Sequence, residues 1–281
     1  MKHTVSQQWL SDRLGEAGLA VVDARFVMGQ PDAGRQAYEQ SHIPGAVYFD
    51  LERDLSAPVG VHGGRHPLPD PDELAAKLAK AGIGNDTRVV AYDDQGGAMA
   101  SRFWWLLRYL GHEQVYVLDQ GFAAWNNDGL PTESSLPQPT PASFAVRLQE
   151  ELLAGVADVQ AKLGQSDTVL LDSREAPRYR GETEPLDKAA GHIPGAVNKF
   201  WKGILNDNGR VKDEAALREA FADLPRDRDI IVYCGSGVTA TPNVLALSEA
   251  GFERVKLYAG SWSDWISYEG NPIATGEEEK A

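Results

Sequence analysis

A series of short motifs occurs twice along this chain of 281 residues, in the same order each time. The segment His-Ile-Pro-Gly-Ala-Val stands at residues 42–47 and returns unchanged at residues 192–197. The repeated unit is far longer than the roughly 20 to 45 residues of a solenoid repeat, so the pattern predicts a duplicated domain. The other matched pairs are residues 21–25 with 170–174, 90–92 with 231–233, and 121–125 with 261–265.

The boundary between the two copies is marked by a change in composition. Residues 129–141 are rich in proline and serine and follow neither a helical nor a strand period, which is typical of a semi-rigid linker. We therefore expect an N-terminal domain at residues 1–130, a linker at 131–150 and a C-terminal domain at 151–281.

Short apolar runs alternate with helical patterns in both copies. This alternation predicts an α/β fold in which each domain is a parallel sheet flanked by helices. Ligands of such sheets bind beyond the carboxyl ends of the strands. Strands are expected at residues 20–23, 47–49, 88–92, 114–118, 168–172, 196–199, 229–233 and 254–257. Helices are expected at residues 6–14, 71–81, 98–110, 122–127 and from about 238 to 250.

The only cysteine of the chain, Cys234, stands at such a strand end. An apolar run at residues 230–233 leads into it, and the helical pattern that starts near residue 238 leads out of it. A helix N-terminus carries partial positive charge, and glycines let backbone N–H groups turn inward around an anion. Such a setting stabilises a thiolate, the reactive form of cysteine, so we expect Cys234 to be a catalytic nucleophile. Its anion cradle would consist of Gly235, Ser236, Gly237, Val238, Thr239 and Ala240.

The two copies differ at this position, because Asp93 of the first copy aligns with Cys234 of the second. A carboxylate is a poor nucleophile and repels anions, so we expect the first domain to be non-catalytic and the second to be catalytic. Residues that both copies share are expected to be structural instead. These are His42 with His192, and Asp23 with Asp172.

Composition and charge exclude several classes of protein. A single cysteine rules out an intramolecular disulfide framework, which fits a cytoplasmic protein. The six histidines show no paired metal-ligand spacing, so no metal is expected. No run is long and apolar enough to span a membrane. The formal net charge of −14 argues against nucleic acid and acidic membranes as partners, so a small anionic substrate would need local attraction from loop N–H groups and arginines.

Three features together carry a resemblance to a known family: the repeated His-Ile-Pro-Gly-Ala-Val segment, the loop at residues 234–240, and the segment at 260–265. The chain resembles the two-domain rhodanese-type sulfurtransferases, the group of thiosulfate and 3-mercaptopyruvate sulfurtransferases. The resemblance covers residues 9–272. It implies two tandem rhodanese-like domains with a catalytic C-terminal domain and an aspartate, here Asp93, at the cysteine position of the N-terminal one. It implies no metal or organic cofactor.

The resemblance also implies the chemistry of the site. The Cys234 thiolate would take the outer sulfur of a small anionic donor and become a persulfide. A thiophilic acceptor, such as cyanide or a thiol like that of thioredoxin, would then collect this sulfur. Family members that prefer mercaptopyruvate commonly carry Cys-Gly-Ser-Gly-Val-Thr, as this chain does at residues 234–239. Members that prefer thiosulfate commonly place basic residues after the cysteine.

The same resemblance points to substrate-binding residues. Mercaptopyruvate enzymes tend to carry two arginines for the carboxylate and keto groups, and the first matches Arg178. Leu186 stands at the second position, so the choice between 3-mercaptopyruvate and thiosulfate stays open. Arg180 or Lys188 could replace the missing arginine, although a lysine is not a bidentate carboxylate clamp.

A Ser–His–Asp relay proposed for mercaptopyruvate enzymes matches Ser236, His66 and Asp50. The relay would polarise the substrate and assist proton transfer as pyruvate leaves. The segment between Asp50 and His66 is longer than expected and contains several glycines, so His62 competes with His66 for the role.

Two rival functions place a nucleophilic cysteine in a similar loop. Phosphatase-like enzymes need an arginine six residues after the cysteine, and Ala240 occupies that position here. A persulfide carrier or binding module that delivers sulfur to a partner protein would use the same Cys234. The sequence therefore argues against the first rival and leaves the second open.

Overall fold

The structure is a computed structural model that describes residues 2–278. The chain divides into two compact units, and each is described by itself. Unit 1 comprises Met1–Ala57, Pro69–Gln149 and Leu205–Val211, and unit 2 comprises Pro58–Leu68, Glu150–Ile204 and Lys212–Ala281. Each unit therefore includes a short segment from the part of the chain that mainly builds the other unit.

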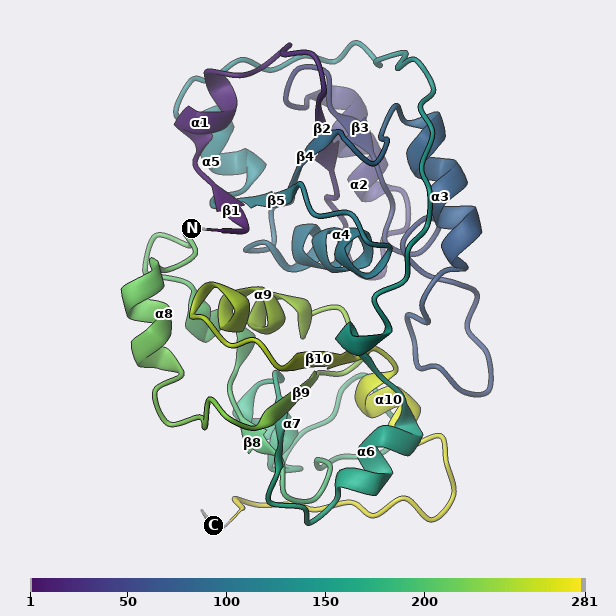
Figure 1. Cartoon of the computed structure of the whole chain (residues 1–281), viewed down its shortest axis with the longest axis vertical. Helices are drawn as coiled ribbons and strands as arrows, with labels where there is room; N and C mark the ends of the chain where they lie inside the picture. The colour runs from purple at the N-terminus through teal and green to yellow at the C-terminus, as the bar shows by residue number, and fades with distance from the viewer. Residues whose placement is uncertain (1, 279–281) are drawn as a thin grey trace. The chain divides into compact units, whose positions relative to one another are not determined.

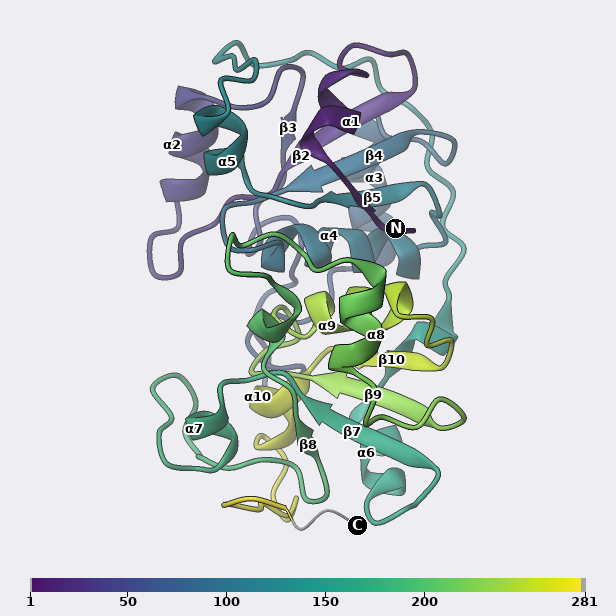
Figure 2. The ribbon, with the colours of Figure 1, turned by 90° about the vertical axis from the view of Figure 1, so that its left-hand side faces the viewer.

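Unit 1 is built on a five-stranded parallel sheet with strand order β1-β5-β4-β2-β3. Helix α4 covers one face of this sheet, and α1 and α5 cover the other (Figures 1 and 2). The strands are β1 (Thr4–Val5), β2 (Leu19–Asp23), β3 (Val47–Tyr48), β4 (Arg88–Tyr92) and β5 (Val115–Leu118). The helices are α1 (Gln7–Ser11), α2 (Ala33–Gln40), α3 (Pro71–Lys80), α4 (Ala98–Tyr109) and α5 (Phe122–Asn127).

Unit 2 repeats this sheet with strand order β6-β10-β9-β7-β8, again parallel throughout. Helices α8 and α9 cover one face and α6 and α10 the other (Figures 1 and 2). The strands are β6 (Leu153–Ala154), β7 (Thr168–Asp172), β8 (Val197–Asn198), β9 (Asp229–Tyr233) and β10 (Val255–Tyr258). The α-helices are α6 (Val156–Lys162), α7 (Ala176–Tyr179), α8 (Glu214–Ala220), α9 (Thr241–Glu249) and α10 (Ser261–Trp265), and the 3₁₀ helices are η1 (Glu150–Leu152) and η2 (Trp201–Ile204).

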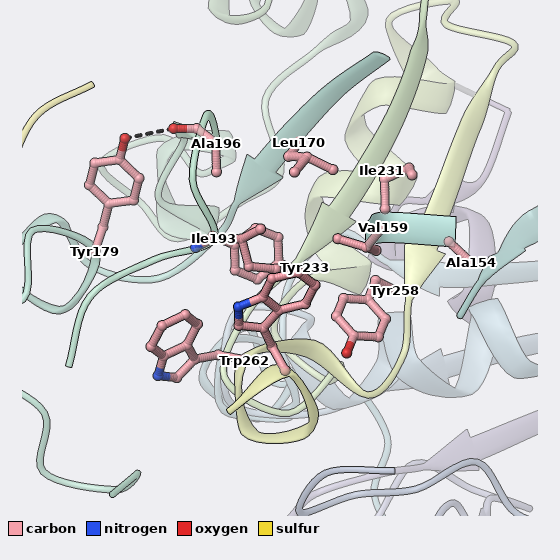
Figure 3. Packing of buried hydrophobic residues seen from close by; sticks show 11 residues of the cluster. Ala154, Val159, Leu170, Tyr179, Ile193, Ala196, Ile231, Tyr233, Tyr258 and Trp262 are labelled. Carbon is pink, nitrogen blue, oxygen red and sulfur yellow. Dashed lines mark hydrogen bonds between the residues drawn. The ribbon is translucent and has the colours of Figure 1, made fainter. Parts of the chain in front are cut away.

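The core of unit 2 packs large side chains between the sheet and α10 (Figure 3). Trp262 and Trp265 of α10 are both fully buried. Full burial of a large apolar side chain stabilises a fold by roughly 1.5 to 3 kcal/mol. The tryptophans therefore hold α10 firmly against the strands whose carboxyl ends carry the candidate site.

The residues that both copies share form the same buried contacts in both units. In unit 2, Nη2 of Arg174 donates to Asp172 at 2.6 Å and to the carbonyl of Gly191 at 2.6 Å. In unit 1, Nη2 of Arg25 donates to Asp23 at 2.6 Å. These ion pairs tie the end of a central strand to the loop that follows it, which is a structural role.

The duplicated histidines are also buried, and Nδ1 of each contacts a backbone carbonyl oxygen. Nδ1 of His192 lies 2.7 Å from the carbonyl oxygen of Tyr179, and Nδ1 of His42 lies 2.6 Å from that of Tyr38. Each histidine ring also stacks on the ring of the same tyrosine. The repeated His-Ile-Pro-Gly turn is therefore held in the same way in both units.

The expected α/β class, two parallel sheets flanked by helices, is confirmed. The expected helix from about residue 238 is wrong at its start, because α9 begins at Thr241. Gly237 has a φ of +75°, outside the helical region, and residues 238–240 form a turn. Helix α2 lacks an expected counterpart: its N-cap makes no side-chain hydrogen bond, and Tyr38 is its one large buried side chain.

None of the helices within residues 2–278 combines the length and the apolar character that crossing a membrane requires.

Candidate functional site

Cys234 directly follows β9, at the carboxyl end of the strand. Its side chain is only 1% exposed. Its backbone N–H donates to Oγ of Ser261 at 3.1 Å, and its carbonyl oxygen accepts from the N–H of Trp262 at 3.0 Å. Both partners belong to α10, so this helix holds the cysteine backbone in place.

Ser261 adopts an unusual backbone conformation to make this contact. Its φ is +55°, and it is the only non-glycine residue between positions 2 and 278 with a positive φ. A left-handed conformation costs a non-glycine residue about 1 to 3 kcal/mol. The Ser261 hydroxyl also donates to the carbonyl of Tyr258 at 2.9 Å. Two hydrogen bonds therefore hold a strained residue against Cys234.

The loop after Cys234 depends on a glycine at position 237. The φ of Gly237 is +75°, and a Cβ atom there would lie 2.0 Å from the carbonyl oxygen of Ala259. Backbone groups approach too closely for any other residue type. The loop can therefore pass tightly beside the end of β10 before α9 begins.

The same loop presents backbone N–H groups that make no hydrogen bond. Within residues 2–278, the N–H groups of Ser236, Val238, Thr239 and Ala240 have no hydrogen-bond partner. Ala240 is the N-cap of α9, so the positive end of this helix dipole adds to the donors. Unfilled N–H groups of this kind form a site for negative charge beside Cys234.

In unit 1, the N–H groups of the equivalent loop bind the side chain of Asp93. Asp93 follows β4 in the way that the cysteine follows β9. Its Oδ1 accepts from the N–H groups of Gln95 at 2.8 Å and Gly97 at 2.9 Å, and its Oδ2 from those of Met99 at 2.7 Å and Ala100 at 2.9 Å. Burial raises the pKa of the Asp93 carboxyl above its ordinary value, although the four N–H donors act against that rise.

Arg178 is brought to the site by α7 and by two buried carboxylates. Its Nη2 donates to Oε1 of Glu184 at 2.7 Å and to Oδ2 of Asp187 at 3.1 Å. The Glu184 and Asp187 side chains are 3% and 4% exposed, whereas Arg178 is 15% exposed. Burial raises the pKa of Glu184, but hydrogen bonds from Arg178 and from the backbone N–H of Leu186 outweigh it, so the pKa lies below its ordinary value.

Arg65 is a site residue that we did not expect from the sequence. Its Nη1 donates to Oδ1 of Asp187, the carboxylate that also pairs with Arg178. A Cβ atom on Gly235 would lie 3.0 Å from Nη2 of Arg65 and 3.4 Å from Nη2 of Arg178. The two guanidinium groups therefore lie together over the residue that follows Cys234. The one available sequence signal was the position of Arg65 beside His66.

Arg180 and Lys188 have different surroundings from Arg178. The Arg180 guanidinium donates to Glu182 at 2.7 Å and to Glu277 at 3.3 Å. Lys188 is exposed and makes no ion pair within residues 2–278. Leu186, at the position of the missing second arginine, is 44% exposed. Arg178 shares its partner Asp187 with Arg65, whereas the Arg180 guanidinium pairs with Glu182 and Glu277.

The two candidate relay histidines contact different serines. Nδ1 of His66 lies 2.8 Å from Oγ of Ser236, which is 7% exposed. Nδ1 of His62 lies 2.7 Å from Oγ of Ser267, and its ring stacks on Tyr268 with 4.0 Å between the centroids. His66 rather than His62 therefore contacts the serine of the loop.

Asp50, the expected acid of the relay, belongs to unit 1. Its Oδ1 accepts from the backbone N–H groups of Glu52 and Arg53, at 2.9 Å in each case. Its Oδ2 accepts from the Tyr48 hydroxyl at 3.3 Å. These contacts hold the turn after β3.

Within residues 2–278, no group of three or more histidine, cysteine, aspartate or glutamate side chains is arranged to hold a metal ion.

Comparisons with known proteins cover both units. A sequence model of the rhodanese-like domain matches twice, at residues 6–128 and 155–268. A relative from Pseudomonas aeruginosa, named a probable 3-mercaptopyruvate sulfurtransferase, is 48% identical over 279 residues, 97% of this chain and 98% of the relative. The thiosulfate sulfurtransferase of Gallus gallus is 35% identical over 273 residues, 93% of this chain and 92% of that protein. The crystal structure of a 3-mercaptopyruvate sulfotransferase from Escherichia coli is similar with a TM-score of 0.82 and 34% identity, over 94% of this chain and 100% of that one.

Proposed function

Because this chain belongs to the tandem rhodanese-domain sulfurtransferases, we propose that it moves sulfur from 3-mercaptopyruvate or thiosulfate to a thiophilic acceptor through a persulfide on Cys234. The observation that carries this proposal is the set of unfilled N–H donors in the loop after the only cysteine. The filled counterpart at Asp93 supports it, because there the same loop binds a negatively charged group.

In the first half-reaction, the Cys234 thiolate attacks the transferable sulfur of the donor and forms an S–S bond. With 3-mercaptopyruvate the C–S bond breaks, and the carbon that leaves takes up a proton to give pyruvate. With thiosulfate the S–S bond of the donor breaks and sulfite leaves. The persulfide carries its negative charge on the outer sulfur, where the N–H groups of Ser236, Val238 and Thr239 would stabilise it.

In the second half-reaction, the acceptor attacks the outer sulfur of the persulfide. Cyanide would leave as thiocyanate, and a thiol such as that of thioredoxin would leave as a persulfide, in each case with return of the Cys234 thiolate. The enzyme alternates between two covalent states, so ping-pong kinetics are expected. Because the Cys234 side chain is only 1% exposed, donor and acceptor must present a small or extended reactive group.

The relay would serve the first half-reaction. Nδ1 of His66 lies 2.8 Å from the hydroxyl oxygen of Ser236, two residues after the nucleophile Cys234. This pair could hold the donor carbonyl and deliver the proton that the leaving pyruvate carbon needs.

The experiment that tests the function compares the wild-type protein with Cys234→Ser. The wild type should gain the mass of one sulfur atom on incubation with donor, and should turn over repeatedly when cyanide is present. Cys234→Ser should do neither, because its hydroxyl cannot form a persulfide. An unchanged circular dichroism spectrum for the variant would show that its fold is intact.

Two results would decide against the proposal. Sulfur transfer that survives in Cys234→Ser would remove the cysteine from the mechanism. A wild type that takes up one sulfur and then fails to turn over with small acceptors would instead be a persulfide carrier. The ratio of kcat/KM for 3-mercaptopyruvate to that for thiosulfate, measured in the same experiment, would identify the donor.

A further inference from the structure

We propose that residues 273–278 form a C-terminal strap that closes the base of a loop at residues 180–191 and thereby positions Arg178 for the donor. This inference rests on the proposed function and deepens it, because it gives the end of the chain a part in donor binding. It also gives Arg180 a role. This arginine joins the strap to the loop and acts as a positioning residue, not as a ligand of the donor.

The 180–191 loop distinguishes the two copies of the repeat. In both units a tyrosine ring stacks on the histidine of the His-Ile-Pro-Gly turn. Residues 39–41 connect this pair in unit 1, whereas residues 180–191 connect it in unit 2. The longer connection carries Glu184 and Asp187, the two carboxylates that pair with Arg178. The loop is therefore specific to the copy that contains the candidate nucleophile.

The two ends of the loop meet at Thr275 of the strap. A Cβ atom on Gly181 would lie 3.3 Å from the backbone nitrogen of Gly191 and 2.8 Å from Cγ2 of Thr275. A Cβ atom on Gly191 would lie 3.3 Å from the same methyl group and 2.4 Å from the carbonyl oxygen of Ala274. A compact loop whose ends lie close together is an Ω-loop, a type that frequently carries functional residues. The strap therefore lies across the base of such a loop.

The strap is bonded to the start of the loop. The N–H of Gly276 donates to the carbonyl oxygen of Arg180 at 2.9 Å. The Arg180 guanidinium donates to Glu277 of the strap at 3.3 Å and to Glu182 of the loop at 2.7 Å. The Arg180 side chain is 28% exposed and that of Glu277 is 71% exposed, so solvent weakens their ion pair. The backbone hydrogen bond therefore contributes more to the attachment than the ion pair does.

The strap also differs from the equivalent segment of unit 1. There, Glu133 forms the backbone bridge to the histidine of the turn, and its side chain accepts from the N–H of the turn's glycine at 2.6 Å. In unit 2, Ala274 forms the bridge, and the side chain of Glu278 accepts from the equivalent N–H at 2.8 Å. Residues 275–277, which lie between the two, are those that contact the 180–191 loop. The strap therefore holds this loop in addition to the turn.

The loop links the strap to the donor site. Nη2 of Arg178 donates to Glu184 at 2.7 Å and to Asp187 at 3.1 Å, and both carboxylates lie within the loop. If the base of the loop opens, these carboxylates move and the Arg178 guanidinium loses its orientation. Cys234 is held by α10 instead, so its reactivity should change little. Loss of the strap should therefore raise KM for the donor more than it lowers kcat.

The test compares two truncated chains. Truncation after Thr275 removes the contacts of residues 276–278, so we expect KM for the preferred donor to rise roughly tenfold with kcat changed much less, as for the loss of one or two hydrogen bonds that orient a binding group. Truncation after Glu278 is the matched control. It leaves every contact of the strap described above in place and should have the KM of the wild type. Equal KM values for the two truncated chains would overturn the proposal.

Point variants separate positioning from a general loss of stability. Arg180→Gln should raise KM for the donor by roughly twofold to fivefold, because its partner is exposed, and Arg180→Lys should restore part of the loss. Glu133→Gln weakens the turn of unit 1 in the same way as loss of Glu278 weakens that of unit 2. It should lower the midpoint of urea unfolding and leave KM unchanged. A rise of KM in Glu133→Gln equal to that in the chain truncated after Thr275 would show that instability alone is the cause.

Hydrogen exchange separates this inference from the proposed function, because it requires no turnover. Truncation after Thr275 should speed amide exchange at residues 180–191, whereas exchange in the loop after Cys234 should stay as in the wild type. This result would support the strap even if the wild type proved inactive with both donors. Unchanged exchange at residues 180–191, or an unchanged KM in a truncated enzyme that is active, would contradict it.

Discussion

Gly237 shows most directly how one residue shapes the site. Its positive φ and the 2.0 Å approach of the Ala259 carbonyl to a would-be Cβ leave no space for a side chain. Both constraints act on the loop that carries the unfilled N–H groups. A substitution here should therefore change the fold locally and the chemistry at the same time.

We expect Gly237→Ala to be clearly more destabilising than Gly164→Ala. Gly164 has a φ of +69° with nothing within 4 Å, so both variants bear the left-handed backbone cost of about 1 to 2 kcal/mol, and only position 237 adds the overlap. The midpoint of urea unfolding measures stability, and mass spectrometry measures persulfide formation. Gly237→Ala should lower both, whereas Gly164→Ala should lower the midpoint alone. Equal midpoints for the two variants would contradict this account.

At the residue scale, the sequence predicted the parts of the site that are neighbours in the chain. Cys234 and its loop could be recognised because strand end, glycines and helix start follow one another within a few positions. Arg65 could not, because its partner Asp187 is 122 residues away and the connection exists only in the folded unit. The sequence offers Arg180 and Lys188 only as basic residues near Leu186, where the second arginine is missing.

At the scale of elements, the short segment Pro58–Leu68 contributes two residues to the candidate site. It has no regular secondary structure, yet it supplies both Arg65 and His66 to unit 2. Its attachment depends on the close approach of Gly64 to α10, where φ is +76° and a Cβ would lie 2.7 Å from Oγ of Ser263.

We expect Gly64→Ala to displace this segment and so lower kcat/KM for the donor by at least about tenfold, because two donor contacts would move together. Gly60→Ala is the matched control, since a Cβ there meets only the carbonyl oxygen of His62 at 3.3 Å and its φ is not positive. Limited proteolysis should cut Gly64→Ala within residues 58–68 faster than Gly60→Ala. Wild-type kinetics in Gly64→Ala would show that the segment is not needed for catalysis.

Elements with strong apolar runs could be predicted from the sequence, and weakly patterned ones could not. Strands β4, β7 and β9 have the expected bounds because each is a continuous apolar run inside a parallel sheet. Helix α2 has only Gly34 and Tyr38 buried, which gives no recognisable helical stripe. Its position follows instead from tertiary packing, since a Cβ on Gly34 would lie 2.0 Å from the carbonyl of Arg25.

At the scale of the whole molecule, the net charge of −14 acts against the local attraction of the arginines. The two effects have different ranges. Screening shortens from about 30 Å at 0.01 M salt to about 10 Å at 0.1 M, so it removes the repulsion between the distant charges and the donor first. Contacts between the arginines of the site and a bound donor would be short, so salt would screen them much less.

We therefore expect kcat/KM for the anionic donor to rise as ionic strength increases from about 0.01 to 0.1 M. The matched control is kcat/KM for cyanide as acceptor, which is mainly uncharged hydrogen cyanide at neutral pH and should change little. Initial rates in a series of salt concentrations give both values. A fall in kcat/KM for the donor over this range would mean that the attraction of the site arginines outweighs the repulsion by the net charge even at low salt.

The carboxylate of Asp93 acts as an anion that is permanently tethered to its own receptor. Four backbone N–H groups hold it at 2.7 to 2.9 Å. A dissolved anion cannot compete for that loop unless the tethered group first leaves, and the chain itself keeps the group in place. Sulfate, sulfite or chloride should therefore inhibit by binding only to the loop after Cys234. The equivalent loop of unit 1 should give them no second binding site.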